Sequence, residues 1–250
     1  MRGSRRRFPR HRSTVLDILF AARFVPAFPL HRSMDLSEVS QARSTAKQRI
    51  GWTAVFAKAH ALASVDIPEL RDLFVKRPLR HLYRHPASVL SVSIHRKDDQ
   101  GTERLIWGQI SNVETMSLVD LQNRFDQFVH APLKTIYKDG LILEAAPVLA
   151  RRLVWRWVMN WGARKRAKHV GTYSISSLAG MNCLNAYHPL VTSSSLAFGP
   201  LHSSGRSDVV LLCDHRVIDG VLGARILDGI EEKLRTSICA ELSELDSAGS

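Results

Sequence analysis

The sequence has few of the residues that characterise disulfide scaffolds, fibrous proteins or membrane spans. Its 250 residues include only three cysteines, Cys183, Cys213 and Cys239, and their spacing is not that of a metal site. With 14 glycines and 10 prolines, collagen-like and low-complexity chains are excluded. No stretch approaches the run of about 20 apolar residues that a membrane-spanning helix needs. We therefore expect a globular protein with reduced thiols, located in the cytoplasm.

Acidic residues are also scarce relative to basic ones. The chain has 35 Lys and Arg against 23 Asp and Glu, a formal charge of +12, and a pI near 10.2. Such an excess predicts attraction to an anionic partner, which could be nucleic acid, a membrane surface or a phosphorylated small molecule. The arginines at 5–7 loosely match a twin-arginine export signal. Asp17 and Arg23 interrupt the apolar run that should follow such a signal, so export is not favoured.

Apolar residues make up 45% of the chain, enough for the core of one large domain or two small ones. The pattern predicts helices over 37–47, from Thr53 to before Pro68, and after a Ser117 cap. Alternation from Leu90, a turn at 98–101 and apolar residues at 104–110 predict a hairpin.

The second half of the chain continues this mixture. Residues 148–161 read as an amphipathic helix with a buried face, opposite Arg152, Arg156 and Asn160, made of Leu149, Leu153, Val154, Trp157, Val158 and Trp161. Strands are expected at 171–176, around 195–198 and at 208–213, and a last helix from Leu222 to Leu234. Because strands and helices do not alternate strictly, we expect an α+β domain with a mixed sheet.

The stretch 209–228 carries the clearest chemical signal. A buried strand runs directly into Asp214-His215-Arg216-Val217-Ile218-Asp219-Gly220 and then into a helix. A histidine at a strand end can act as the general base for a thiol or hydroxyl nucleophile. The alternative is that His215 is a hydrogen-bonded structural histidine and Asp219 the cap of the last helix. The spacing alone does not decide between them.

This motif resembles the Asp-His-Arg-x-x-Asp-Gly signature of dihydrolipoamide acyltransferases, the transacylases of 2-oxoacid dehydrogenase complexes. It is also similar to the His-x-x-x-Asp-Gly motif of chloramphenicol acetyltransferase, which shares their fold. Gly171-Thr172-Tyr173-Ser174-Ile175-Ser176-Ser177-Leu178 looks like the family's Gly-Thr-Phe-Thr-Ile-Ser-Asn-Leu-Gly. Tyr187-His188-Pro189-Leu190-Val191 resembles its Phe-Thr-Pro-Ile-Ile. Ala57-Lys58-Ala59 through Pro68-Glu69-Leu70 is similar to an Ala-rich helix of the family.

The resemblance implies an acyl-transfer mechanism. His215 matches the base that takes the proton from the thiol of CoA or dihydrolipoamide, and the thiolate then attacks an acyl thioester. Ser176 matches the hydroxyl that stabilises the tetrahedral oxyanion, with Ser174 as the second choice. Asp219 matches an acid that pairs with an arginine near the chain start, for which Arg10 and Arg12 are the candidates. A strand serine that merely faces solvent is the alternative for Ser176.

The resemblance also implies the organisation of the molecule. Asp214, Arg216 and Gly220 complete the signature in positioning roles. CoA is expected as substrate, with no covalently bound cofactor and no metal. The expected fold is that of chloramphenicol acetyltransferase, a mixed central sheet flanked by helices that assembles as a homotrimer or an assembly of trimers. His215 and Ser176 would then meet from neighbouring chains. The expected parts are a basic N-terminal arm and lead-in over 1–27, the catalytic domain over 28–236 and a polar tail over 237–250.

Several positions depart from the family pattern. Ser177 replaces its Asn, Ala179 displaces its Gly, and the connection 199–207 is shorter than its usual hairpin. No segment resembles a lipoyl or peripheral-subunit-binding domain. We therefore expect a free-standing relative whose acceptor need not be lipoamide.

Two other functional classes stay open. One is a scaffold that has the fold without catalysis. The other is a basic surface protein, in which the Trp155–Trp161 helix contacts an anionic membrane or nucleic acid. Nucleic acid is disfavoured because no strand platform interleaves aromatic and basic residues.

Overall fold

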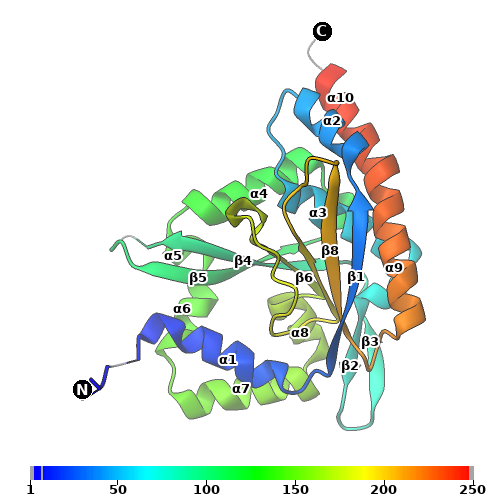
Figure 1. The fold of residues 1–250 in the computed structure, drawn as a ribbon. Coiled ribbons are helices and arrows are strands. Elements are labelled where there is room, and N and C mark those ends of the chain that lie inside the picture. The colour runs from blue at the N-terminus through cyan, green and yellow to red at the C-terminus, as the bar shows by residue number, and fades with distance from the viewer. Residues whose placement is uncertain (1–2, 7, 99, 248–250) are drawn as a thin grey trace.

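A six-stranded mixed sheet organises the computed structural model, which describes residues 3–6, 8–98 and 100–247 (Figure 1). The strand order is β1-β8-β7-β6-β4-β5; β6 is parallel to both of its neighbours, and the other pairs are antiparallel. These strands are β1 (Ala27–Asp35), β4 (Val89–Lys97), β5 (Glu103–Ser111), β6 (Tyr173–Ser177), β7 (Ser194–Phe198) and β8 (Arg206–Asp214). A separate hairpin is formed by β2 (Asp72–Val75) and β3 (His81–Arg84).

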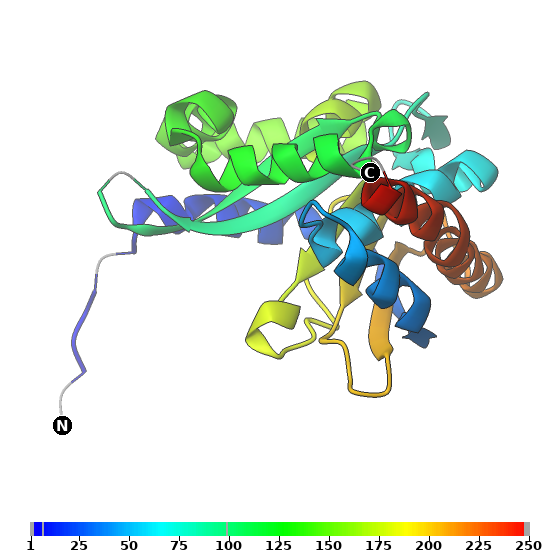
Figure 2. The same ribbon diagram turned by 90° about the horizontal axis from the view of Figure 1, so that it is seen from above.

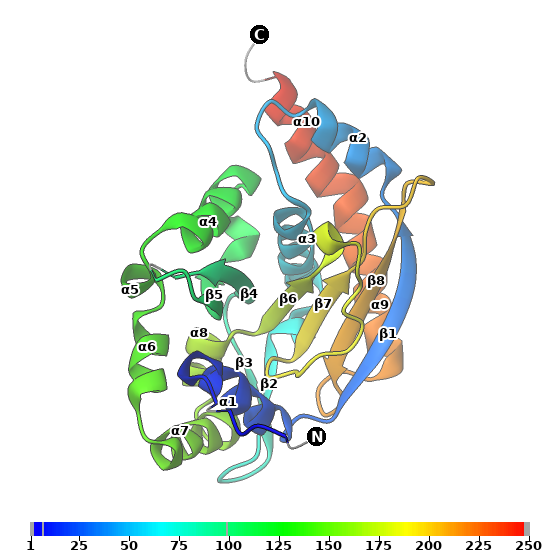
Figure 3. The ribbon, with the colours of Figure 1, turned by 60° about the vertical axis from the view of Figure 1, so that its left-hand side comes forward.

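One face of the sheet carries the main core. It packs against α3 (Trp52–Asp66) and α9 (Gly220–Lys233), which lie behind the sheet in Figure 3. The Tyr173 hydroxyl donates to the Ala57 carbonyl at 2.9 Å, and Gly223 brings α9 against Leu30 so closely that a Cβ would collide. Further helices here are α2 (Ser37–Thr45), α4 (Leu118–His130) and α10 (Cys239–Ser247). Figure 2 shows α4 lying along the β4–β5 hairpin, where Phe128 packs on Gly108.

The opposite face is covered at one end by a second cluster of helices, seen together in Figure 3. They are α1 (Ser13–Ala22), α5 (Leu133–Ile136), α6 (Lys138–Ala145), α7 (Val148–Asn160) and α8 (Ala163–Val170). Trp155 and Met159 of α7 pack with Leu212 of β8 in this second core. Short helical turns complete the chain at Arg10–Arg12, Pro68–Arg71, Val113–Thr115, Ala179–Met181 and Leu234–Ile238. Within the described residues, no helix combines the length and apolar character that crossing a bilayer requires.

Most of the expected elements are confirmed. The Ser117 hydroxyl caps α4 by accepting from Asp120 N at 3.0 Å, and the β4–β5 hairpin has the expected turn. β8 is buried from Val209 to Leu212, between β1 and β7. The α+β class with a mixed sheet flanked by helices is therefore confirmed.

The predicted buried face of α7 is wrong for most of its residues, although Val158 does pack against the second core. Leu149 and Leu153 are 73% and 59% exposed, and Trp157 and Trp161 are also exposed. The inward stripe is instead formed by Arg151, Trp155 and Met159 at helical spacing.

The cause is a buried acid on α1. The Arg151 guanidinium lies 2.9 Å from the carboxylate of Asp17, which is buried. A buried carboxylate needs a charged partner, and this pairing sets the rotation of α7. Apolar residues on the other side of the helix are consequently left in contact with solvent.

The two chain ends also differ from expectation. Residues 13–22, assigned to the basic arm, form α1 and pack against α7. Residues 239–247, assigned to the polar tail, form α10, which packs against α2. Leu234, Ile238 and Leu242 recur every fourth residue and are buried, so they extend the α9 face through a π-helical turn. That spacing is the signal that could have identified this helix.

Candidate functional site

The signature segment forms the turn between β8 and α9. Asp214, the last residue of β8, is fully buried and accepts from the Arg216 side chain at 2.8 Å (Nε) and 2.6 Å (Nη2). Its backbone carbonyl also accepts from the amides of Val217 and Ile218. This bidentate pair and these backbone bonds fix the shape of the turn that carries His215.

A second guanidinium lies behind Asp214. Arg166 of α8 is 1% exposed and donates twice to the Val191 carbonyl, at 3.0 and 2.8 Å, and once to Phe74 O at 3.3 Å. Burial lowers the pKa of Arg166 to about 10, while the charge of Asp214 opposes that shift. Sequence reasoning missed Arg166, because nothing in a run of basic residues distinguishes the buried one.

His215 is exposed at the start of the turn. Its Nδ1 lies 3.3 Å from the carbonyl oxygen of Ile218, and its ring centroid lies 4.4 Å from that of Phe28. The tautomer protonated on Nδ1 donates to this carbonyl, and Nε2 then keeps its lone pair. A carbonyl thus orients the imidazole, and a base nitrogen stays available to a ligand.

Asp219 begins α9. Its Oδ1 accepts from the amide of Leu222 at 2.8 Å, which caps the helix. Among the described residues, no cation lies within ion-pair distance of this carboxylate, and Arg12 is exposed on its own helical turn. The side chain of Arg10 lies outside the described residues, so the expected arginine partner stays a prediction. Gly220, the first residue of α9, has no atom near the place of a Cβ.

Ser174 and Ser176 lie on the sheet face opposite α3, because Tyr173 and Ile175 point into the main core. The Ser174 hydroxyl lies 3.2 Å from that of Thr192, and Asn185 donates to Ser176 Oγ at 3.3 Å. Both contacts come from the loop that crosses this face. Asn185 and Thr192 are therefore polar neighbours that sequence reasoning did not identify.

A histidine–serine pair lies beside these serines. Nε2 of His188 is 2.7 Å from Ser195 Oγ, and Ser195 also donates to the Ser174 carbonyl at 3.3 Å. Desolvation lowers the pKa of His188, so its imidazole is neutral at pH 7. Ser195 is fully buried and cannot meet a substrate. The pair therefore holds β7 against the loop rather than forming a nucleophile.

The strand register separates His215 from Ser176. Ser176 is level with Ala197 of β7 and so with Val210 of β8, and His215 follows Val210 by five residues. This offset is about 16 Å along the strand and about 10 Å across two strand spacings, roughly 19 Å together. Catalytic groups must approach within about 3 Å of the reacting atoms. One chain cannot bring both side chains to the same atom.

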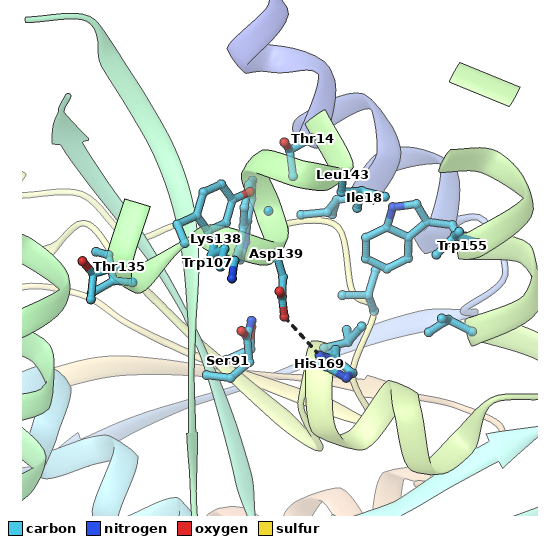
Figure 4. Close-up of a pocket in the computed structure, with 18 residues that line it drawn as sticks. Thr14, Ile18, Ser91, Trp107, Thr135, Lys138, Asp139, Leu143, Trp155 and His169 are labelled. Carbon is cyan, nitrogen blue, oxygen red and sulfur yellow. Dashed lines mark ion pairs between the residues drawn. The ribbon is translucent and has the colours of Figure 1, made fainter. Parts of the chain in front are cut away.

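A cavity of about 430 Å³ opens on the face of the sheet that carries Ser174 and Ser176 (Figure 4). Helices α1, α6 and α7 and strands β4 and β5 enclose it, and Trp107, Leu143 and Trp155 supply apolar wall. Asp139 and His169 face each other across its mouth at 3.9 Å. Ser91 lies on its floor and is in register with Ser174 one strand away. Ser174 and Ser176 do not line the cavity, but its floor lies one strand away from Ser174.

Two of the three cysteines, Cys213 and Cys239, are poor nucleophiles, whereas Cys183 is an exposed free thiol. Burial raises the pKa of the Cys213 thiol to about 12, and desolvation also raises that of Cys239. In the described part of the chain, no three His, Cys, Asp or Glu side chains are close enough to hold a metal ion.

No family model and no curated protein matches the chain. Solved structures do match it over nearly its whole length. A probable dihydrolipoamide acetyltransferase from Listeria monocytogenes is 13% identical, with 100% of this chain and 97% of the other covered and a TM-score of 0.67. The chain has the fold of a dihydrolipoamide acetyltransferase core.

Two further structures share this acetyltransferase fold. One is the dihydrolipoamide acetyltransferase of Azotobacter vinelandii, 18% identical over 96% of this chain and 95% of the other, with a TM-score of 0.67. It was determined to study the catalytic role of a serine, a histidine and an asparagine. The other is the cubic core of a pyruvate dehydrogenase multienzyme complex, 18% identical over 96% and 95%, with a TM-score of 0.63. At these identities the likeness establishes the acetyltransferase fold.

Proposed function

We propose that the protein is an acyltransferase that moves an acyl group between CoA and a thiol or other acceptor. The observation that carries the proposal is the exposed His215, whose Nδ1 is occupied by the Ile218 carbonyl and whose Nε2 is available. The acetyltransferase fold supports it, and in the similar Azotobacter enzyme a serine and a histidine were studied for their catalytic role. This chain offers Ser176 and His215 for those two roles.

The proposed reaction has two proton transfers. Nε2 of His215 removes the proton of the acceptor thiol, and the thiolate attacks the thioester carbonyl of the acyl donor. The Ser176 hydroxyl donates to the oxyanion of the tetrahedral intermediate. Collapse breaks the carbon–sulfur bond to CoA, and the imidazolium returns its proton to the leaving thiolate. Asp214 and Arg216 hold the histidine turn, and Asp219 holds the first turn of α9.

We further propose a homotrimer, or an assembly of trimers, in which His215 of one chain meets Ser176 of the next. The separation of about 19 Å within one chain supports this arrangement. The similar cubic core is the core of a multienzyme complex. A cytoplasmic location stays a prediction from the cysteine content.

We also propose that the cavity takes an apolar acyl chain of the donor. Its volume lies within the range of small-molecule pockets, its walls are mainly apolar, and Ser91 on its floor adjoins Ser174.

Release of free CoA tests the function. The protein is offered acetyl-CoA and longer acyl-CoA donors with dihydrolipoamide or other thiols. His215→Ala should lower kcat/KM by about 10²–10⁴-fold and Ser176→Ala by about 10²–10³-fold. His202→Ala, an exposed histidine on the β7–β8 connection, is the matched control and should act as wild type. Equal inertness of wild type and His215→Ala across all donors would leave a non-catalytic scaffold as the better reading.

A further inference from the structure

The outer face of α7 is an exposed apolar surface. It carries Leu149, Leu153 and Trp157, because the inward stripe of the helix is fixed by Asp17, and the exposed Trp161 follows directly after the helix. The tip of the β2–β3 hairpin lies beside its end: Arg77 N donates to Asn160 O at 3.0 Å and its guanidinium lies 5.3 Å from the Trp161 ring centroid. In Figures 1 and 3 both elements lie at the same end of the molecule.

The hairpin tip adds to this apolar area. Leu79 is 79% exposed, and Leu82 is exposed on β3. We call the outer face of α7 together with this tip the basic–apolar surface. A cluster of exposed apolar side chains at one end of a molecule is typical of a surface that binds a protein, a membrane or a ligand.

The hairpin tip and helices α7 and α8, together with the residues that flank them, hold nearly all of the net charge of the chain. Residues 73–88 and 145–171 contain eleven Lys and Arg residues and no Asp or Glu. Arg84 pairs with Asp72, Arg151 and Arg152 pair with Asp17, and Arg166 is buried. The other seven are exposed, and none of them has a carboxylate within ion-pair distance in the described part of the chain. Four of them belong to the basic–apolar surface, Lys76, Arg77 and Arg80 on the hairpin tip and Arg156 on α7, and the other three lie on α8.

We propose that the basic–apolar surface binds an anionic lipid bilayer at its headgroup level. Exposed Trp and Leu side chains on an amphipathic helix insert at the boundary between headgroups and acyl chains. Unpaired lysines and arginines around them are attracted to anionic headgroups. A second copy of the same surface is a poor occupant, because the two would face each other with like charges. Nucleic acid would satisfy the cations and leave the leucines in water.

Binding to vesicles tests the proposal on the full chain. Vesicles of phosphatidylcholine with about 30% phosphatidylserine should sediment the protein, whereas pure phosphatidylcholine vesicles bind it at least about tenfold more weakly. Raising the salt concentration should weaken the binding. The fluorescence of Trp157 and Trp161 should shift to the blue on binding, and Trp157→Phe should reduce this shift.

Two sets of variants separate the apolar and the charged contributions. Leu149→Asp with Leu153→Asp changes two exposed side chains and should lower binding by about 10²-fold or more. Lys76→Glu, Arg80→Glu and Arg156→Glu together should lower it by a similar factor.

Matched controls keep the same chemistry elsewhere. Val65→Asp with Val129→Asp places two acids on other exposed apolar positions, on α3 and α4. Lys47→Glu, Arg49→Glu and Arg124→Glu make the same charge change away from this surface. Both controls should bind vesicles within about threefold of wild type, because long-range attraction alone is screened by salt.

Four outcomes would overturn the proposal. Wild type binds neither vesicle, or the charge control loses as much binding as the surface triple. Leu149→Asp with Leu153→Asp leaves vesicle binding unchanged while duplex DNA binds as tightly, which indicates a general polyanion site. The fourth outcome is that Leu149→Asp with Leu153→Asp lowers the oligomeric state, which would make the surface an interface between copies. None of these bears on CoA release, so the acyl-transfer proposal is tested separately.

Discussion

Two inactive variants should restore activity to each other when they are co-expressed. His215→Ala removes the proposed base and Ser176→Ala the proposed oxyanion donor. If each site takes its histidine from one chain and its serine from the next, a mixed assembly contains some sites with both groups intact. If both groups act within one chain, every site lacks one of them.

The expected recovery of activity follows from the distance between the two residues and from the mixing of two kinds of chain. His215 and Ser176 are roughly 19 Å apart within one chain, so no rotamer of either side chain brings them to one reacting atom. A cyclic trimer that contains both variants has three interfaces, and only one of them joins an intact histidine to an intact serine. Activity of trimers that contain both variants should therefore recover to about one third of wild type.

The assay is CoA release by assemblies that carry two different affinity tags and are purified on both. Each single variant, and the double variant co-expressed with either single one, should stay at background. The reasoning is refuted if doubly tagged assemblies have the size of wild type and show no recovery.

Three further predictions concern stability and specificity. Arg151→Ala leaves the Asp17 carboxylate buried without its close partner and should lower the free energy of unfolding by about 3–5 kcal/mol. Arg152 lies 4.0 Å from the same carboxylate, so Arg152→Ala should lower it by under about 1 kcal/mol. Urea unfolding measures both losses, and equal losses would contradict the role given to Asp17 in orienting α7. Burial lowers the pKa of His60 to about 3, so below pH 6.5, the ordinary pKa of histidine, the unfolded chain binds a proton that the folded chain does not. The free energy of unfolding should therefore fall by about 2 kcal/mol from pH 6.5 to 5. In His60→Gln the urea midpoint should no longer show this dependence on pH. Val154→Phe fills the cavity and should lower kcat/KM for long acyl-CoA donors about tenfold relative to acetyl-CoA, and an equal loss for both donors would argue against an acyl chain there.

The sequence predicts elements whose own pattern determines them. The continuous apolar run of β8, the spacing of Leu222, Ile226 and Ile230 on α9, and the Ser117 cap are each local signals, and the structure contains all three elements. The signature between β8 and α9 indicated the fold for the same reason. The roles of its residues stay predictions, because they depend on a ligand and on neighbouring chains that a local motif does not specify.

Other features depend on partners far away in the sequence. β1 includes Pro29, and proline disfavours a strand because it has no backbone N–H to donate. The proline is tolerated here because β1 is an edge strand that pairs only with β8. The face of α7 that is buried depends on Asp17, a single acid on another helix. Arg166 looks like its basic neighbours until Val191 and Phe74 are placed around it. No local pattern contains this information.

The two proposals, a site shared between chains and a membrane surface on each chain, constrain one another. In a cyclic trimer the three basic–apolar surfaces lie at the same height along the axis and point in equivalent directions. If the outer face of α7 points along that axis, all three contact one bilayer together, and the apparent affinity should exceed that of a single copy by about 10²–10⁴-fold. If it points away from the axis, only one surface contacts the bilayer at a time. Vesicle affinity measured above and below the concentration at which the assembly dissociates separates these two arrangements: a steep loss on dissociation fits the first, and an unchanged affinity per chain fits the second.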